Sequence, residues 1–366
     1  MSVESDLQKD GIEVIKKLDT LRVNSIARMV SISLCETFPN FNLNQNNLFI
    51  KLSRLNMYIA KMPEGMAEAN YFYKNSSIYF NDRIDDEDLE EFAIHECIHH
   101  IQEIKDKRNY LLRMGLCDYT EFKIYGLGLN EAAVQLMSSK VLGIPKEYVK
   151  YFNLSFETTS PTYYPLECCL VNQLGYIVGE DVLFDSTINS NDNFKKKMID
   201  FTSNKAFMEI QNSIDDILCT EENIIKINNK IIQNDNRNKK VDNMINKVNS
   251  LKKNITSTFI KTQNLIISSY FDKAFYNIKT LEDIENYRKK LYNFKDYLGS
   301  TEGYTYFNNY YVNKMVDLEN KYNLLENSAI DNSLYLIKNK DSIVLKLIRY
   351  IRKIFVKPEI KERKIS

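Results

Sequence analysis

Two histidines four residues apart carry the clearest chemical signal in this sequence. His95 and His99 fall in a segment that predicts a helix, so one turn separates them and both imidazoles lie on one face. Imidazoles at this spacing can bind one metal ion, and zinc suits nitrogen ligands without a redox role. Glu96 points about 100° around the helix, close to the metal without being a ligand. The pattern predicts a zinc site with Glu96 as the general base.

A third protein ligand must come from another part of the chain. The sequence holds 3 His, and the last of them, His100, points away from the metal face. Glu103 is too distant, because eight residues of helix span about 12 Å. Glu131 is the preferred ligand, although an acid in the first turn of a helix can also simply favour the helix dipole. Three other acids are alternative ligands: Asp118, Glu121 and Glu167.

The HExxH motif and the later Asn130-Glu131 pair resemble the gluzincin zinc metallopeptidases, of which thermolysin-like enzymes are typical. The resemblance covers about residues 69–143. It implies a zincin-like domain with one Zn²⁺ per chain that hydrolyses peptide or protein substrates with a metal-activated water. It also implies an edge strand, Ala69–Tyr73, that pairs with the substrate backbone through Ala69, Asn70 and Tyr71.

Two features depart from the thermolysin-like pattern. In those enzymes an Asp four residues after the ligand Glu orients a ligand His, whereas this chain has Gln135. Those enzymes also use a downstream His near the oxyanion, which this chain lacks, so another donor must stabilise the tetrahedral intermediate. Tyr163 and Tyr164 are the candidate catalytic residues for this role, with plain packing as the alternative.

The surrounding segments predict an α+β fold. Two aromatic and β-branched runs around residues 74–76 indicate a hairpin, and Asp85 and Asp86 are expected caps of the helix that carries the motif. The other expected elements are two helices over 3–38, one or two strands over 48–63, and helices over 85–107, 129–142 and 165–184.

The second half of the chain changes to long helical segments rich in Asn, Lys and Ile. We expect a metallopeptidase domain over 1–218 and a mostly helical region over 219–366. Isoleucine and valine runs after residue 224 indicate a helical hairpin or short coiled coil, which can serve packing, substrate restriction or self-association. The basic amphipathic stretch 343–357 predicts either a docked helix with a solvated face or a helix on a membrane surface or partner.

Composition narrows the partners and the compartment. The formal net charge is +0, with 49 basic and 49 acidic residues, so nucleic acid is not an expected partner. The 6 Cys form no CxxC pair, which indicates reduced thiols. The first residues lack a signal-peptide pattern and no run of about 20 apolar residues occurs, so we expect a cytoplasmic protein without a membrane span.

Two other functions are compatible with parts of the pattern. Glu96-x-x-His99 is also the half-motif of di-iron carboxylate proteins, but no further His supplies the second half. The other alternative is an inactive zinc-binding regulatory or interaction module that uses the helical C-terminal region. The leading hypothesis remains a zinc metalloendopeptidase.

Overall fold

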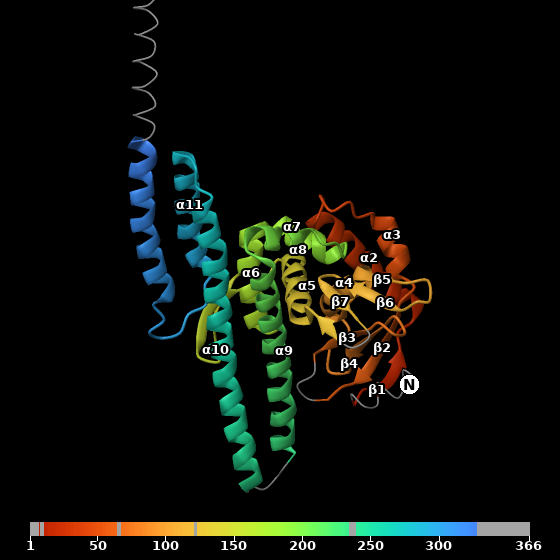
Figure 1. Ribbon diagram of the computed structural model, residues 1–366. Coiled ribbons are helices and arrows are strands. Elements are labelled where there is room, and N and C mark those ends of the chain that lie inside the picture. The colour runs from red at the N-terminus through yellow and green to blue at the C-terminus, as the bar shows by residue number, and fades with distance from the viewer. Residues whose placement is uncertain (1–6, 8–10, 64–66, 121–122, 234–238, 328–366) are drawn as a thin grey trace, which may run out of the picture. The chain divides into compact units, whose positions relative to one another are not determined.

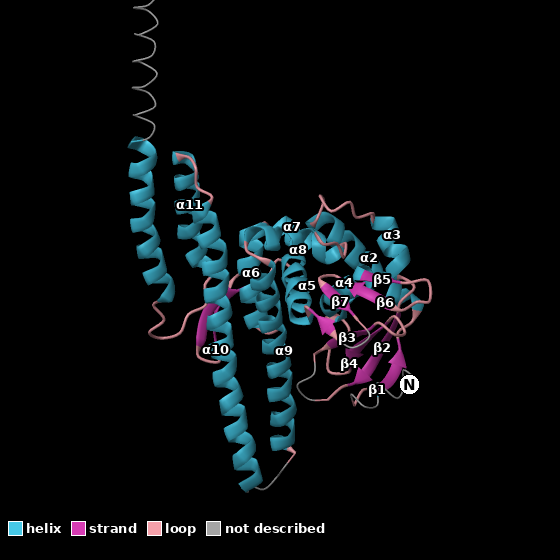
Figure 2. Cartoon of the chain, viewed as in Figure 1, coloured by secondary structure: helices cyan, strands magenta, loops and turns pink. Residues whose placement is uncertain are grey.

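The computed structural model describes residues 7, 11–63, 67–120, 123–233 and 239–327. Long helices are combined with small sheets, in agreement with the predicted α+β class (Figure 2). Contacts divide the chain into two compact units, Met1–Tyr276 with Asn293–Phe307, and Asn277–Tyr292 with Asn308–Ser366. The boundary expected at residue 219 lies inside a continuous helix and remains a prediction. In the described part of the chain, no helix is both long and apolar enough to cross a membrane.

A four-stranded mixed sheet lies next to the helix of the motif. Its strands, in spatial order, are β1 (Glu13–Lys17), β2 (Asn56–Lys61), β4 (Ser77–Asn81) and β3 (Ala69–Phe72). β2 and β4 are parallel, whereas β3 and β4 form the predicted antiparallel hairpin. β3 is therefore an edge strand of this sheet, which leaves one side of its backbone free of strand pairing.

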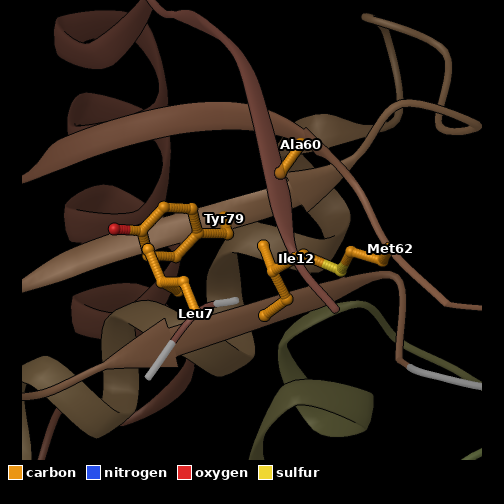
Figure 3. Close-up of a cluster of buried hydrophobic side chains, with 5 residues drawn as sticks. All are labelled: Leu7, Ile12, Ala60, Met62 and Tyr79. Atoms are coloured by element: carbon orange, nitrogen blue, oxygen red, sulfur yellow. The ribbon is translucent and has the colours of Figure 1, made fainter. Parts of the chain in front are cut away.

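Both faces of strand β4 are covered by apolar groups. Ile78 and Phe80 are buried on one face, and Tyr79, which points to the other, is also buried. Helix α4 (Leu89–Gln102) packs against β3 and β4. Figure 3 shows the cluster on the side of Tyr79, which consists of Leu7, Ile12, Ala60, Met62 and Tyr79. This packing fixes the sheet and, with it, the edge strand beside α4.

The beginning of the chain departs from the sequence prediction. Residues 13–17 form strand β1 instead of part of a helix, because they pair with β2. The second predicted helix is present as α2 (Thr20–Thr37). The segment over 48–63 begins as helix α3 (Gln45–Leu52), capped by the side chain of Asn44, and only then enters β2. A short apolar run fits both the helical and the strand periodicity, and pairing with distant strands decides which structure forms.

Helix α4 is shorter than the predicted 85–107. It begins after Asp88, because Asp85 lies in a preceding turn in which its carbonyl accepts from the Asp88 N–H at 3.0 Å. Asp85 and Asp86 are therefore not its caps. At the other end the chain becomes extended at Glu103 and forms β5 (Glu103–Lys105), which pairs with β6 (Leu111–Met114). Strand pairing here overrides the local helical pattern.

A second antiparallel sheet leads into the helix that carries Glu131. Its strands β5, β6, β7 (Cys117–Tyr119) and β8 (Ile124–Tyr125) follow in chain order. Gly126, with a φ of 78°, then turns the chain into α5 (Leu127–Val141), close to the predicted 129–142.

The remaining helices of this unit follow a short hairpin of β9 (Glu147–Tyr151) and β10 (Leu154–Thr158). They are α6 (Pro165–Val178), α7 (Glu180–Ile188), α8 (Asn193–Phe201), α9 (Asn204–Ile232) and α10 (Lys239–Tyr276). The helix predicted over 165–184 is split at Gly179, whose φ is 102°. α9 and α10 run side by side as the predicted helical hairpin (Figure 1).

The second unit is helical where it is described. It contains most of α11 (Leu281–Phe294), which is capped by Thr280: the Asp283 N–H donates to Thr280 Oγ1 at 3.1 Å. A single-turn 3-10 helix, Lys295–Tyr297, follows it in the chain, and residues 306–327 are helical. The basic stretch 343–357 lies outside the described residues.

Candidate metal centre

The two motif histidines and Glu131 come together between α4 and α5. Nε2 of His99 lies 3.0 Å from Nε2 of His95, and each of these nitrogens lies 3.3 Å from Oε2 of Glu131. The three groups can hold a metal ion. Among the described residues they are the one such group of three or more His, Cys, Asp or Glu side chains.

These separations match those of a tetrahedral site. Zinc bonds of about 2.0–2.1 Å to nitrogen and oxygen place neighbouring ligand atoms roughly 3.3 Å apart. Two His and one Glu also leave one of four positions open, as in catalytic zinc sites. The donor set therefore fits zinc without rearrangement of the backbone.

Gln135 orients one of the ligand candidates. Its Oε1 accepts a hydrogen bond from Nδ1 of His95 at 3.0 Å, so the proton sits on Nδ1 and the Nε2 lone pair faces the triad. Gln135 follows Glu131 by one helical turn, so both residues face α4. The side-chain amide of Gln135 lies where thermolysin-like enzymes have an Asp. It supplies an uncharged acceptor to the ligand His.

Glu131 and His99 shift each other's pKa strongly when no metal is bound. Burial opposes the charge on Glu131, but the adjacent His99 and His95 hold the pKa of this carboxyl well below its usual range. For His99, burial lowers the pKa, and the carboxylate of Glu131 outweighs it and raises the pKa to about 9. A metal ion must displace that proton, so metal affinity depends on pH.

Glu96 lies beside the triad and is held by the edge strand. Its Oε2 accepts from the backbone N–H of Tyr71 at 2.6 Å. Burial raises the pKa of the Glu96 carboxyl, and the nearby His95 and His99 oppose that rise. A buried carboxylate with a raised pKa is suited to accepting a proton near neutral pH.

The edge strand offers one residue with free backbone groups to a ligand. Alternate residues of an antiparallel strand direct their N–H and C=O to the same side. The carbonyl of Glu68 accepts from the Asn81 N–H at 2.7 Å, so the even-numbered residues face β4. Ala69 and Tyr71 therefore face the open edge, where the Tyr71 N–H is already bonded to Glu96. No described residue forms a hydrogen bond with the N–H or the C=O of Ala69, so both can pair with an extended peptide.

The backbone N–H and C=O of Asn70 face β4 and not the open edge, where a substrate strand was predicted to pair. The side chain of Tyr71 has a positioning role instead, since its hydroxyl contacts Nδ1 of His100 at 2.8 Å. His100 lies 3.5 Å from Glu103, and Lys105 pairs with Glu103 at 2.8 Å. This chain of contacts holds the strand against the end of α4.

A cleft of about 160 Å³ opens beside His95 and Glu96. Both tyrosines singled out from the sequence line it, but they differ in position. The ring of Tyr164 stacks beside the imidazole of His95, with centroids 6.1 Å apart. The hydroxyl of Tyr163 instead donates to Oε2 of Glu68 at 2.6 Å, on the side of the edge strand. Tyr164 is the better placed of the two to reach a group bound at the triad.

The alternative ligands lie elsewhere or outside the described part. Asp118 faces Lys195, with 3.3 Å between Oδ2 and Nζ. Glu167 is fully buried and faces Glu221 on α9. Glu121 falls outside the described residues. Glu131 is thus the acid that the fold brings to the two histidines.

Distant residues hold the first turn of α5 in place. Both carboxylate oxygens of Asp215, on α9, accept backbone hydrogen bonds: from Gly126 at 2.8 Å and from Gly128 at 2.9 Å. The side chain of Asn130 accepts from the Leu116 N–H at 3.0 Å. Asn130 therefore anchors the helix, while the next residue, Glu131, is presented to the histidines.

Several of these residues carry no local sequence signal. The cap by Asp215 joins groups almost ninety positions apart, and the bond from Tyr71 to Glu96 depends on the edge strand lying against α4. The register of the hairpin could have indicated that the N–H of Tyr71 faces outward, because alternate residues of an edge strand direct their backbone groups away from the partner strand.

Comparisons with protein-family models, with curated proteins and with solved structures give no match.

Proposed function

We propose that the protein is a zinc-dependent metallopeptidase with a gluzincin-like site in a zincin-like domain. The observation that carries the proposal is the meeting of His95, His99 and Glu131 beside a cleft that also contains Glu96. The open side of β3 borders the same cleft through Ala69. The candidate metal site, the proposed base and the edge strand therefore lie at the same cleft.

Zinc is the proposed metal, one ion per chain, held by the two Nε2 atoms and Oε2 of Glu131. When bound, it supplies Lewis acidity that makes a water a better nucleophile and polarises a carbonyl. Gln135 keeps the Nε2 lone pair of His95 directed at the site. His99 must lose its proton for the site to form.

Glu96 acts as the general base in this proposal. Its position next to both histidines is within reach of the attacking water, and the Tyr71 N–H fixes one of its oxygens. The proton that it accepts is then delivered to the leaving amine. Its raised pKa makes both transfers feasible near neutral pH.

Tyr164 is the proposed donor to the developing oxyanion. Burial, with the nearby carboxylates of Glu131 and Glu96, holds the pKa of its phenol well above the usual value, so the hydroxyl stays protonated. A protonated phenol beside the metal ligands can donate to negative charge that develops on the carbonyl oxygen.

The substrate is proposed to be an extended peptide that pairs with Ala69 as an added strand. All six cysteines are free, which supports a reducing, cytoplasmic setting for the enzyme.

Metal content tests the ligand assignment. We expect one zinc per wild-type chain by elemental analysis, and loss of it in His95→Ala, His99→Ala and Glu131→Ala. Circular dichroism of each variant separates metal loss from unfolding. Retention of one zinc per chain in all three folded variants would show that the site is elsewhere.

A chelator-sensitive cleavage assay on a mixed peptide library tests the activity. We expect Glu96→Gln to keep its zinc and lose cleavage by several orders of magnitude, since the amide cannot accept the proton. Equal turnover in wild type and Glu96→Gln would exclude Glu96 as the base. Stoichiometric zinc without any cleavage would favour the non-catalytic zinc module.

A further inference from the structure

Two carboxylates in the cleft lack a cationic partner among the described residues. Glu68 directly precedes β3, and Glu91 lies one helical turn before His95 on α4. Glu68 accepts from the hydroxyl of Tyr163, which is a neutral donor. Neither acid forms an ion pair within the part of the chain that the structure describes, and no Lys or Arg lines the cleft.

Two nearby acids do have a cationic partner. Glu90, next to Glu91 in the chain, pairs with Arg22 at 2.8 Å. Glu103, at the opposite end of α4, pairs with Lys105 at 2.8 Å. Glu68 and Glu91 differ from these acids in lining the cleft without a cationic partner among the described residues.

The two acids line the same cleft as Tyr163. The Tyr163 hydroxyl donates to Oε2 of Glu68 at 2.6 Å, and Glu91 directly precedes Phe92 on α4. The ring of Tyr163 packs edge-on against Phe92, with centroids 6.4 Å apart. An acidic end is thus combined with an apolar wall.

Part of the remaining wall is apolar as well. Leu142, Ile144 and Pro161 line the cleft together with Phe92. Such a surface accommodates methylene groups, whereas its acidic end favours a positive charge. The combination matches a ligand group with an aliphatic stem and a cationic tip.

We infer that the cleft selects peptides that place a cationic nitrogen near the cleaved bond. This inference rests on the proposed function and names its substrate class. The cation is an ammonium or guanidinium group, supplied either by a Lys or Arg side chain or by the free α-amino end of the peptide. It pairs with Glu68 and Glu91, which have no counter-ion among the residues that the structure describes.

A peptide series tests the inference on the zinc-loaded full chain. Fluorogenic peptides derived from one cleaved library sequence carry Lys, Arg, norleucine or Gln at the position next to the cleaved bond, each with a free or an acetylated N-terminus. We expect kcat/KM to be about tenfold or more higher for the cationic members. A loss on acetylation assigns the α-amino group, and a loss on norleucine substitution assigns the side chain.

Matched variants assign the selectivity to the two acids. Glu68→Gln and Glu91→Gln should each reduce several-fold the ratio between kcat/KM for the cationic peptides and kcat/KM for the acetylated norleucine peptide. Glu87→Gln, an exposed acid before α4 that does not line the cleft, is the control and should keep the preference. Equal preference in wild type and both cleft variants would overturn the inference.

Binding separates this inference from the proposed hydrolysis. Zinc-loaded Glu96→Gln is titrated with C-terminally fluorescein-labelled peptides that carry the same substitutions and N-termini, in an arbitrary library sequence if none is cleaved. Fluorescence anisotropy reports Kd. Tighter binding of cationic peptides, weakened in Glu96→Gln/Glu91→Gln, supports the inference even if the wild type cleaves no peptide. Equal Kd values for Lys and norleucine peptides, and for free and acetylated ends, contradict it whether or not cleavage occurs.

Discussion

The backbone N–H of Tyr71 and the Oε2 atom of Glu96 lie 2.6 Å apart and form a hydrogen bond. The edge strand and the proposed general base are therefore joined directly. A second contact, from the Tyr71 hydroxyl to Nδ1 of His100 at 2.8 Å, ties the same residue to the last turn of α4. The free edge of the strand is therefore held at a fixed position relative to the candidate metal ligands, as the proposed strand-type recognition of a peptide would require.

Gln135→Leu is expected to weaken zinc binding by about 10- to 100-fold. The change removes the acceptor for Nδ1–H of His95, so the imidazole is no longer held in one orientation and tautomer. Competition with a chromogenic zinc chelator gives the affinity. Gln135→Glu, which keeps an acceptor at the same place, should recover most of it. If Gln135→Leu binds zinc as tightly as the wild type, the hydrogen bond has no orienting role.

Tyr164→Phe should reduce kcat by about 10²- to 10³-fold, the usual effect of removing one oxyanion donor. Zinc content and KM should stay near wild-type values, because the ring still stacks on His95. Steady-state kinetics on a cleaved peptide provides both constants. Tyr148→Phe is the matched control, since this tyrosine is 72 % exposed on β9. A kcat unchanged by Tyr164→Phe would leave the residue with a packing role.

The sequence predicted those parts of the site that depend on short spacing. His95, Glu96 and His99 lie on one helix, where the period alone places them. The hairpin of β3 and β4 was also accessible. So was the ligand candidate Glu131, because the chain has no further His for the site and the Asn130-Glu131 pair lies at the start of the next predicted helix.

Contacts between distant segments could not be predicted in the same way. β1 was interpreted as a helix because its apolar residues fit two periods, and its partner β2 lies some forty residues later. The role of Gln135 depends on the approach of α5 to α4, and the unbalanced charge of Glu91 is apparent only once the cationic neighbours are placed. These properties arise from packing, which a single sequence does not specify locally.

Asp215→Ala is expected to destabilise the protein by about 1–3 kcal/mol, because the buried N–H groups of Gly126 and Gly128 lose their acceptor. Urea unfolding of the metal-free protein measures the effect. Zinc affinity should fall as well, since Glu131 directly follows the first turn of α5. Asp216→Ala, a change at the exposed neighbour, should alter neither property. Equal stability of the two variants would exclude Asp215 as the cap.

The last prediction concerns a buried pair of acids between α6 and α9. Glu167 is fully buried and Glu221 is 9 % exposed. Burial raises the pKa of both carboxyls, and their mutual approach allows one proton to be shared between them. The folded state therefore binds more protons than the unfolded state above the ordinary carboxyl pKa of 4.5. The free energy of unfolding must then fall as pH rises from that value through the raised pKa values.

Glu167→Gln should flatten this dependence, because the amide can donate to Glu221 without a titrating proton. Each extra proton held by the folded state lowers the free energy of unfolding by about 1.4 kcal/mol per pH unit of increase. The stability of the variant relative to the wild type should therefore increase with pH. Urea unfolding between pH 5 and pH 9 measures both curves. Glu222→Gln removes an exposed acid paired with Lys226 at 3.6 Å and should leave the slope unchanged. Parallel curves for Glu167→Gln and wild type would mean that the pair does not retain a proton in the folded protein.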